Sequence, residues 1–193
     1  GDIDNALFYM NKSFSYAEKV NNLETMAKVS GDLGIIYHSI GMVSKAREFF
    51  YRSIDISRKI SYPRGYIAGC INLGILHMDK GRFNKAETLF EEALDTSKEI
   101  SSRLYECVSL TNLGDIMYER GTFDNAVKFY NESVEVAREI NAPVEEGVNC
   151  IGLARVYLKQ QLYEKTAEML EAAFKIFNDA GEATYLGVYH IYK

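Results

Sequence analysis

The sequence predicts an all-α fold, a solenoid of antiparallel helix pairs, because one pattern of residues recurs with a period of 40. The segment INLGILHMDKGRFNKAETLFEEAL, from Ile71 to Leu94, returns 40 residues later as TNLGDIMYERGTFDNAVKFYNESV, from Thr111 to Val134. Within each copy, apolar and small residues follow the spacing of one helix face, twice in succession. A period of this length indicates a repeat architecture in which each copy packs on its neighbours.

The recurring positions show what each copy contains. The first helix of a copy carries a leucine followed by a small residue: Leu33 and Gly34, Leu73 and Gly74, Leu113 and Gly114, Leu153 and Ala154. The second helix carries a small residue and, four positions later, an aromatic one: Ala46 and Phe50, Ala86 and Phe90, Ala126 and Tyr130. Small residues at these places allow the two helices of a pair to approach closely. A glycine between the helices can take the positive φ that ends a helix: Gly41, Gly81, Gly121.

The same pattern gives the expected helix boundaries. We expect first helices over about 24–40, 64–80, 104–120 and 144–160, and second helices over about 5–19, 45–59, 85–99, 125–139 and 165–178. Side chains that accept hydrogen bonds stand at the start of the second helices and are expected to cap them: Asp4, Ser44, Asn84, Asp124. Pro63 and Pro143 mark turns between copies, because proline interrupts a helix.

We expect residues 1–193 to form a single solenoid that is a fragment of a longer protein, because the pattern begins and stops in the middle of a repeat. Its expected parts are the second helix of a truncated repeat (1–20), three repeats (24–60, 64–100 and 104–140), a degenerate repeat (144–178) and the start of a further helix (183–193). Apolar residues near both ends lack a neighbouring copy: Leu7, Phe8, Phe14, Tyr185, Leu186, Tyr189. Solenoid ends need polar caps for solubility, so we expect end-to-end self-association.

Composition and charge exclude several classes of protein. The apolar share of 47% and charged share of 25% fit a soluble globular protein. The net charge of −5 comes from mixed acidic and basic residues, which argues against direct binding to nucleic acid. No apolar run reaches the roughly 18 residues of a membrane span, and the start lacks the pattern of a signal peptide, so a cytoplasmic location and no membrane partner are expected. Three cysteines without CxxC spacing favour neither disulfides nor zinc.

The quoted segments resemble the tetratricopeptide repeat. NLGILHMDKGRFNKAETLFEEAL carries its Leu-Gly pair, its second-helix alanine at Ala86, a large apolar residue at Phe90 and a small residue at Ala93. The period of 40 exceeds the usual 34. Basic residues replace the usual closing proline, which allows longer helices: Arg58, Lys98, Arg138. This longer format is similar to that of LGN-type polarity adaptors and of bacterial Rap-type regulators that read short peptides.

The resemblance implies a right-handed superhelix whose concave face, lined by the first helices, binds a peptide segment or helix of a partner protein. On each first helix, the face next to the core-facing stripe is expected to line this groove. Helical spacing places these residues on that face: Asn72, Asn112, Ile71, Ile75, Asp79, Asp115, Tyr118, Glu119, Arg155, Lys159. Asn72 and Asn112 are expected to bond the backbone of an extended peptide, because a carboxamide both donates and accepts. The alternative is a local hydrogen bond or contact with solvent alone. Ile71, Ile75 and Tyr118 either contact the ligand or pack on the preceding copy.

Charge along the expected groove falls into zones. Asp79, Asp115 and Glu119 make its middle acidic, whereas Arg155 and Lys159 make its C-terminal end basic. This arrangement predicts a ligand whose charges follow the complementary order.

The sequence contains no pattern that supports catalysis, and we predict a protein that is not an enzyme and needs no cofactor or metal. His77 lies on a core-facing stripe and is expected to be buried and hydrogen-bonded, while His38 and His190 have no partner at metal-ligand spacing. Cys107 is expected to be partly exposed, without a basic cluster to activate its thiol. No phosphate-binding or dinucleotide-binding glycine motif is present.

The predicted function is therefore a protein–protein interaction module or scaffold that holds a peptide or helix in its groove. The alternative is a sensory or regulatory module of a larger signalling or transcription-regulating protein, in which a peptide or a neighbouring domain changes the curvature of the solenoid.

Overall fold

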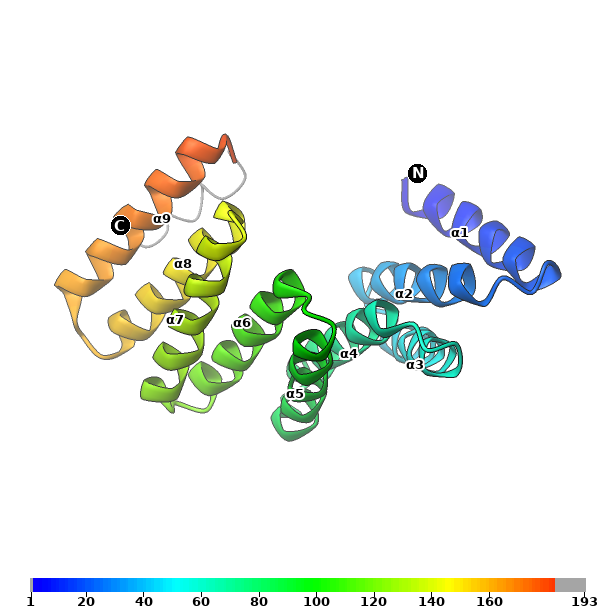
Figure 1. The fold of residues 1–193 in the computed structure, drawn as a ribbon, viewed down its shortest axis with the longest axis horizontal. Helices are drawn as coiled ribbons and strands as arrows, with labels where there is room; N and C mark the ends of the chain where they lie inside the picture. The colour runs from blue at the N-terminus through cyan, green and yellow to red at the C-terminus, as the bar shows by residue number, and fades with distance from the viewer. Residues whose placement is uncertain (1, 183–193) are drawn as a thin grey trace. The chain divides into compact units, whose positions relative to one another are not determined.

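The computed structural model describes residues 2–182, and these residues form α-helices and no strand (Figure 1). The helices are α1 (Asp2–Lys19), α2 (Leu23–Ser39), α3 (Val43–Lys59), α4 (Pro63–Met78), α5 (Phe83–Glu99), α6 (Arg103–Glu119), α7 (Phe123–Glu139), α8 (Pro143–Lys159) and α9 (Tyr163–Ala180). The predicted all-α fold of helix pairs is confirmed. The helix expected over 183–193 lies outside the described residues, as do Tyr185, Leu186, Tyr189 and His190.

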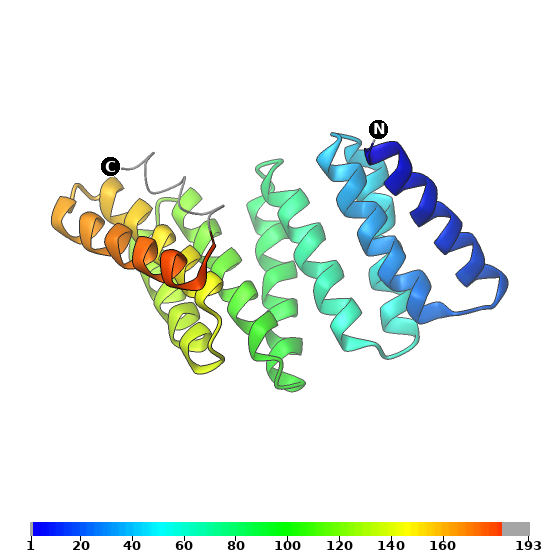
Figure 2. The same cartoon turned by 90° about the horizontal axis from the view of Figure 1, so that it is seen from above.

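The chain divides into two compact units, Gly1–Ile100 and Ser101–Lys193. Unit 1 contains α1 to α5, and unit 2 contains α6 to α9. We call α2, α4, α6 and α8 the first helices, and α1, α3, α5, α7 and α9 the second helices. In both units consecutive helices pack side by side in antiparallel fashion (Figure 2).

First helices also touch one another within each unit. In unit 1, α2 packs against α4, and in unit 2, α6 packs against α8. Within the described part of each unit, by contrast, no second helix packs against another second helix. The layer of first helices is thus the more closely spaced one, so each unit curves toward its first helices. The first helices form the inner surface of each unit, as the family resemblance implies.

Tight turns connect the helices. The turn glycines Gly41, Gly81 and Gly121 have φ of 76°, 66° and 74°, so the predicted positive φ is confirmed. Gln161 occupies the same place in the last copy and has a φ of 59°. A side chain in this conformation is strained, because its Cβ approaches the backbone carbonyl.

The predicted capping of the second helices is wrong. Helices α3, α5 and α7 begin one residue earlier than Ser44, Asn84 and Asp124, which therefore lie inside the first turn. The residues at the cap position make no side-chain cap: Met42, Arg82, Thr122. The reason is the shortness of the turn, in which the backbone itself closes the loop; the amide of Arg82, for example, donates to the carbonyl of His77 at 2.9 Å. Pro63 and Pro143 open α4 and α8, as the sequence predicts.

Glycine in the first helix and an aromatic ring in the second make the closest contacts of each pair. A Cβ added to Gly74 would lie 2.4 Å from the ring of Phe90, and one added to Gly114 would lie 2.7 Å from the ring of Tyr130. The predicted role of small residues in close packing is confirmed. In the last copy, a different small residue and a different large one occupy these positions, Ala154 and Leu170, and both are buried.

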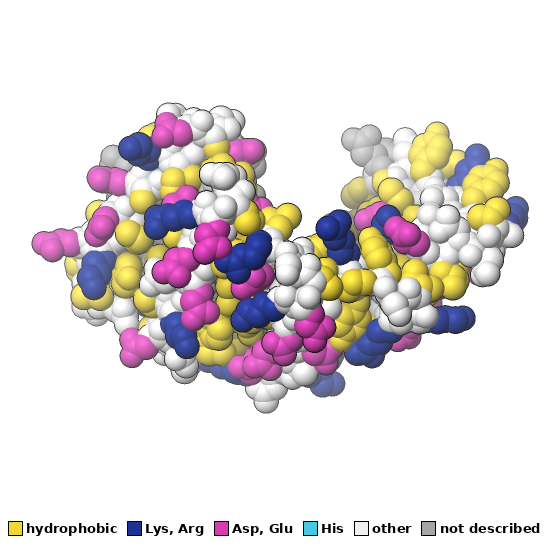
Figure 3. Space-filling view, viewed as in Figure 1, with side chains coloured by type: hydrophobic (Ala, Val, Ile, Leu, Met, Phe, Trp, Pro, Cys, Tyr) yellow, Lys and Arg dark blue, Asp and Glu magenta, His cyan; other side chains and the backbone are white. Residues whose placement is uncertain are grey.

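Helix α1 exposes several large apolar side chains, which appear as yellow patches over this helix in Figure 3. Phe8 is 61% exposed, and Tyr9, Tyr16 and Val20 are exposed as well. Phe14 is partly buried under the guanidinium of Arg52, which lies 4.1 Å from the centre of the ring. This surface is an apolar face that the described residues leave uncovered.

Candidate functional site

The first-helix surface of unit 1 contains the predicted groove residues of α4. Asn72 and Ile75 are partly exposed, whereas Ile71 is only 6% exposed and packs into the core. Among residues 2–182, the carboxamide of Asn72 has no hydrogen-bond partner. Asp79, which follows α4, is exposed and lies 2.9 Å (Oδ2) from Nε2 of His38 on α2. This pair joins two neighbouring first helices, and Asn72 keeps its donors and acceptor available.

The first-helix surface of unit 2 is built around Asp115 of α6. Its Oδ1 accepts a hydrogen bond from the Tyr130 hydroxyl at 2.8 Å and lies 3.1 Å from Nη1 of Arg155 on α8. The second guanidinium nitrogen of Arg155 is 3.7 Å from the carboxylate of Glu119. Acidic and basic residues that were predicted to form separate zones therefore lie together here. The predicted zoning is wrong for Asp115, Glu119 and Arg155, because residues one repeat apart face each other across α6 and α8.

Tyr118 completes this cluster. Its ring lies 4.3 Å from the Arg155 guanidinium carbon and 6.1 Å from the ring of Phe123, with both distances taken to the ring centroid. Cations and aromatic faces attract one another at such distances. Lys159 is exposed at the end of α8 and has no ion-pair partner among the described residues. Charge on this surface is thus largely compensated around Arg155 and uncompensated at Lys159.

Burial governs the protonation of this cluster. Burial raises the pKa of the Asp115 carboxyl, and the Tyr130 hydroxyl and the Arg155 guanidinium lower it only in part. Burial and the neighbouring Asp115 carboxylate together raise the pKa of Tyr130, which keeps its hydroxyl protonated and donating.

Asn112 differs from Asn72 in its hydrogen bonding. Its Nδ2 donates to the carbonyl of Val108, one turn earlier in α6, at 2.7 Å. This is the local bond that the sequence left open as an alternative. Oδ1 of Asn112 remains able to accept a hydrogen bond, so one half of the carboxamide is available to a ligand.

A buried polar network beneath this surface was not predicted. Asn149 of α8 is fully buried, and its Nδ2 donates to Ser133 Oγ at 2.9 Å and to the Glu145 carbonyl at 2.8 Å. Thr111 Oγ1 donates to Asn149 Oδ1 at 3.1 Å and lies 3.0 Å from Ser133 Oγ. The network joins α6, α7 and α8. Repeat alignment does not reveal it, because the position of Asn149 is occupied by Ser109, Gly69 and Val29 in the preceding copies.

The cysteines are buried and protonated. Cys107 is fully buried, so its predicted partial exposure is wrong; its Sγ lies 3.1 Å from Ser133 Oγ. Burial raises the pKa of Cys107, and it raises the pKa of Cys70 and Cys150 to about 11. Thiols with raised pKa values are poor nucleophiles.

His77 is buried as predicted, but the expected hydrogen bond is absent. Its side chain is 4% exposed, and its imidazole makes no hydrogen bond or ion pair within residues 2–182. Burial lowers the pKa of His77, and the nearby cations Lys85, Arg82 and Arg47 lower it further. The ring is therefore neutral near pH 7 and unpaired.

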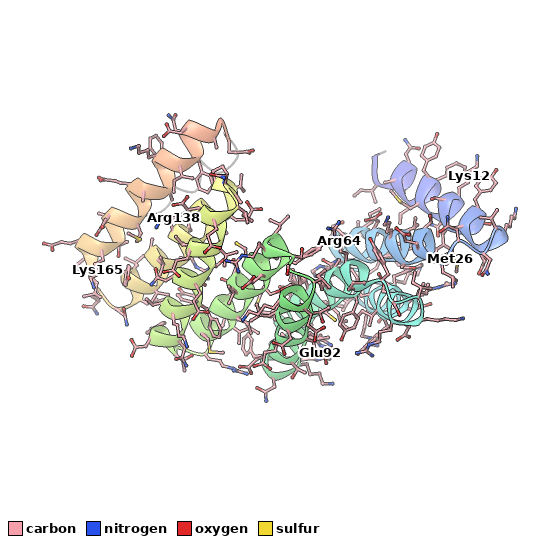
Figure 4. The ribbon with its side chains drawn as sticks, in the orientation of Figure 1. Lys12, Met26, Arg64, Glu92, Arg138 and Lys165 are labelled. Atoms are coloured by element: carbon pink, nitrogen blue, oxygen red, sulfur yellow. The ribbon has the colours of Figure 1, made fainter. Side chains whose placement is uncertain are left out.

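A polar triad connects three helices of unit 1. Arg58 of α3 donates to the Tyr66 hydroxyl at 2.9 Å, and that hydroxyl in turn donates to the carboxylate of Glu92, which is labelled on α5 in Figure 4. In unit 2, Nε of Arg138, also labelled, donates to Glu146 Oε1 at 2.7 Å across α7 and α8. These contacts join second helices to the following first helix and explain two of the basic residues near the ends of the second helices, Arg58 and Arg138.

Residues 67–139, which span parts of both units, match a family model described as tetratricopeptide repeat. Residues 67–139 are thus similar to the tetratricopeptide repeat. The match covers the two copies whose similarity is most evident in the sequence. No curated protein sequence matches the chain significantly.

Solved structures extend the likeness in fold to most of the chain. BtubC (BKLC) from P. vanneervenii has a TM-score of 0.80 at 19% identity, over 94% of this chain and 76% of that one. Aspartyl phosphate phosphatase F from Bacillus subtilis has a TM-score of 0.89 at 14% identity, over 100% of this chain and 52% of that one. NprR, solved in complex with its cognate peptide NprX, has a TM-score of 0.75 at 17% identity, over 98% of this chain and 55% of that one. The chain spans about half the length of the last two proteins.

No group of three or more His, Cys, Asp or Glu residues able to hold a metal ion occurs among residues 2–182. None of the helices described is long and apolar enough to span a membrane.

Proposed function

We propose that the chain is a non-enzymatic protein-interaction module that binds an extended peptide segment or a helix of a partner protein on its first helices. The unpaired carboxamide of Asn72 carries this proposal. It is partly exposed, it lies on the inner layer of unit 1, and it retains two donors and an acceptor for a peptide backbone. Ile75, one turn further along α4, is partly exposed and supplies apolar contact beside it.

Unit 2 supports the same proposal with a different surface. Asp115, Tyr118, Glu119 and Arg155 form a paired cluster, and Lys159 is exposed beyond it. A paired cluster is pre-organised, so it presents fixed donors and acceptors to a ligand at low cost in side-chain entropy. Its near-neutral charge favours a ligand segment that brings one acidic group for Lys159 rather than an acidic tract.

The experiment is a selection of peptides from a displayed random library on the folded chain, followed by affinity measurement for the enriched sequences. Asn72→Ala is expected to weaken binding at least tenfold, because two backbone hydrogen bonds are lost. Asn112→Ala should have a smaller effect, since half of that carboxamide is already bonded to Val108. Asn131→Ala, an exposed asparagine on the second helix α7, is the matched control and should leave affinity unchanged. Equal affinities for Asn72→Ala and Asn131→Ala would contradict the assignment of the site.

A sensory or regulatory role is the second candidate, and the peptide complex of NprR favours it. In a sensory module, the peptide would bind on the first helices and would also change the shape of the chain. Small-angle X-ray scattering with and without a selected peptide separates the two candidates. A change in radius of gyration of the chain beyond what the added mass explains supports the sensory role, whereas an unchanged radius supports a scaffold.

Self-association through α1 is a further part of the proposal on partners. The exposed side chains of Phe8, Tyr9 and Val20 form an apolar face on this helix. Sedimentation equilibrium is expected to show concentration-dependent association that Phe8→Ser reduces. A monomer at all concentrations up to about 1 mM would contradict it.

A further inference from the structure

A pocket of about 440 Å³ lies in unit 1 among α3, α4 and α5, away from the predicted groove residues. Tyr51 comes from α3, Leu73 and His77 come from α4, and Lys85, Thr88 and Leu89 come from α5. Leu73 and Leu89 give the pocket an apolar part, whereas the other side chains bring groups that can donate hydrogen bonds. Three helices thus contribute donors to one space.

His77 is the unusual member of this lining. Its imidazole is buried to more than nine-tenths and lines the pocket, yet it has no hydrogen-bond partner within the described chain. The ring nitrogens of His77 are not among the buried side-chain atoms of residues 2–182 that lack a partner, so they reach the surface of the pocket and can hydrogen-bond to a molecule bound there. A ligand in the pocket would supply the missing partner.

The charge around the pocket is positive and uncompensated. Arg47, Arg82 and Lys85 lie close enough to lower the pKa of His77, and none of the three has an ion-pair partner in residues 2–182. All three cations are exposed to solvent, and of the three only Lys85 lines the pocket itself, so an anion in the pocket would meet one lysine directly and two further cations at longer range. The surroundings of His77 therefore favour a negatively charged ligand.

The histidine and the two arginines of this positive cluster are specific to one copy of the repeat, whereas the position of Lys85 is also a lysine in two other copies, Lys45 and Lys165. The residues 40 positions later carry no positive charge: Glu87, Met117, Thr122, Asn125. Packing of the repeat therefore does not require a histidine or the two arginines at these places, and their combination with a lysine occurs in this copy alone.

We propose that the pocket of His77 and Lys85 binds the phosphate group of a phosphomonoester. Lysine is a common phosphate ligand, and phosphate accepts hydrogen bonds from several directions at once, which suits donors on three helices. Two negative charges match several cations better than the single charge of a carboxylate does. Leu73 and Leu89 would contact the organic part of the ligand. Binding here is independent of peptide binding on the first helices.

Isothermal titration calorimetry with phenyl phosphate, inorganic phosphate and benzoate tests the proposal on the intact chain. Phenyl phosphate is expected to bind at least tenfold more tightly than benzoate, which has the same ring but one charge. Lys85→Met should weaken phenyl phosphate binding at least tenfold. Lys98→Met, which removes the same charge from the far end of α5, is the matched control and should change the affinity less than twofold.

The ring of His77 provides a second readout in the folded wild-type protein. An anion bound beside the imidazole stabilises its charged form, so NMR titration should show a higher pKa for His77 with phenyl phosphate than without it. His77→Gln assigns the signal. No saturable binding of phenyl phosphate at millimolar concentration, equal affinity of the Lys85→Met and Lys98→Met variants, or an unchanged pKa of His77 on saturation would each overturn the proposal.

The source of the phosphomonoester is decided by a further comparison. Free O-phosphoserine and a short peptide that contains phosphoserine present the same group. Tighter binding of the peptide assigns the pocket to phosphorylated protein segments, and equal binding assigns it to small phosphorylated molecules.

Discussion

The first-helix surfaces of the two units share a repeat pattern but treat their polar side chains differently. In unit 1, Asn72 and the buried His77 have no hydrogen-bond partner among the described residues. In unit 2, Asn112 bonds its own helix, Asp115 bonds Tyr130 and Arg155, and the buried Asn149 is bonded to three neighbours. Asn72 and Asn112, which occupy equivalent places, therefore differ: the first carboxamide is open, whereas half of the second is committed to its own helix.

This difference teaches that repeat position alone does not assign a polar residue to function. An unpaired polar group is available to a ligand and adds little to stability, whereas a bonded one adds stability and offers less to a ligand. The predictions below test this contrast, starting with the largest expected effect.

Removing the buried carboxamide of unit 2 should be the most damaging change. Asn149→Ala leaves Thr111 and Ser133 without a shared partner and opens a cavity, so the free energy of unfolding is expected to fall by about 2–4 kcal/mol. Asn72→Ala is expected to change it by less than about 0.5 kcal/mol. Urea denaturation followed by circular dichroism measures both. Similar losses in the two variants would break the contrast between the units.

Adding a methyl group to the glycines that pack against rings should also destabilise unit 2 more than unit 1. The difference in the free energy of unfolding is expected to be smaller than in the previous comparison. Gly114→Ala must displace Tyr130, whose hydroxyl is bonded to Asp115, whereas Gly74→Ala displaces Phe90, which has no such anchor. We expect losses in the free energy of unfolding of about 2 kcal/mol for Gly114→Ala and about 1 kcal/mol for Gly74→Ala. The higher helix propensity of alanine applies equally to both and cancels in the comparison.

The same denaturation experiment measures this second pair. A larger loss for Gly74→Ala would show that the closer ring contact, 2.4 Å against 2.7 Å, outweighs the hydrogen bond as a restraint.

The protonation of Asp115 gives a prediction on pH. Because burial raises its pKa in the folded state, the folded protein holds this proton more tightly than the unfolded chain does. Below pH 3.8, the ordinary pKa of an aspartate, Asp115 is protonated in both states and its contribution to stability is fully present. As pH rises from 3.8 through the raised pKa of the folded state, ionisation of Asp115 lowers the free energy of unfolding.

Tyr130→Phe gives a more direct test of Asp115, because the hydrogen bond from the Tyr130 hydroxyl favours the ionised form of the Asp115 carboxyl over the protonated form. Its removal should raise the pKa of Asp115 further and lower the free energy of unfolding near pH 7 by about 1 kcal/mol. Carbon-detected NMR titration of the Asp115 carboxyl measures the pKa directly. A lower pKa in the variant would contradict the assigned hydrogen bond.

The smallest effect is expected at the last turn of unit 2. Gln161 has a positive φ where the other copies have glycine, so Gln161→Gly should raise the free energy of unfolding by about 0.5–1 kcal/mol. Gln160→Gly, at a neighbouring residue with a φ of −84°, is the control and should not stabilise the protein. Thermal denaturation of the two variants makes the comparison.

Several features were predictable because they depend on residues close in the sequence or on a repeated spacing. Helix existence, the glycine turns and the close approach of paired helices at small residues such as Gly74 follow from apolar periodicity and from the recurrence of small residues. The capping prediction failed because a cap depends on where the chain leaves a turn, and the turn at Gly81 lets α5 begin at once. The residues expected in the groove lie on first helices or, for Asp79, directly after one, and their role in binding stays a prediction. The burial of Ile71 and the pairing of Asp115 with Arg155 depend on the neighbouring copy.

The sequence by itself determined the helix pairs, their glycine turns and the packing of small residues against rings, because these repeat locally every 40 residues. Only the tertiary structure decided which polar side chains are hydrogen-bonded or ion-paired within the protein. Asp115 meets Arg155, and Asn149 meets Thr111 and Ser133, because adjacent helices bring residues from different copies within hydrogen-bond distance. His77 finds no such partner in the described chain. The physical reason is that hydrogen bonds act over about 3 Å, a distance that spacing along the chain does not fix.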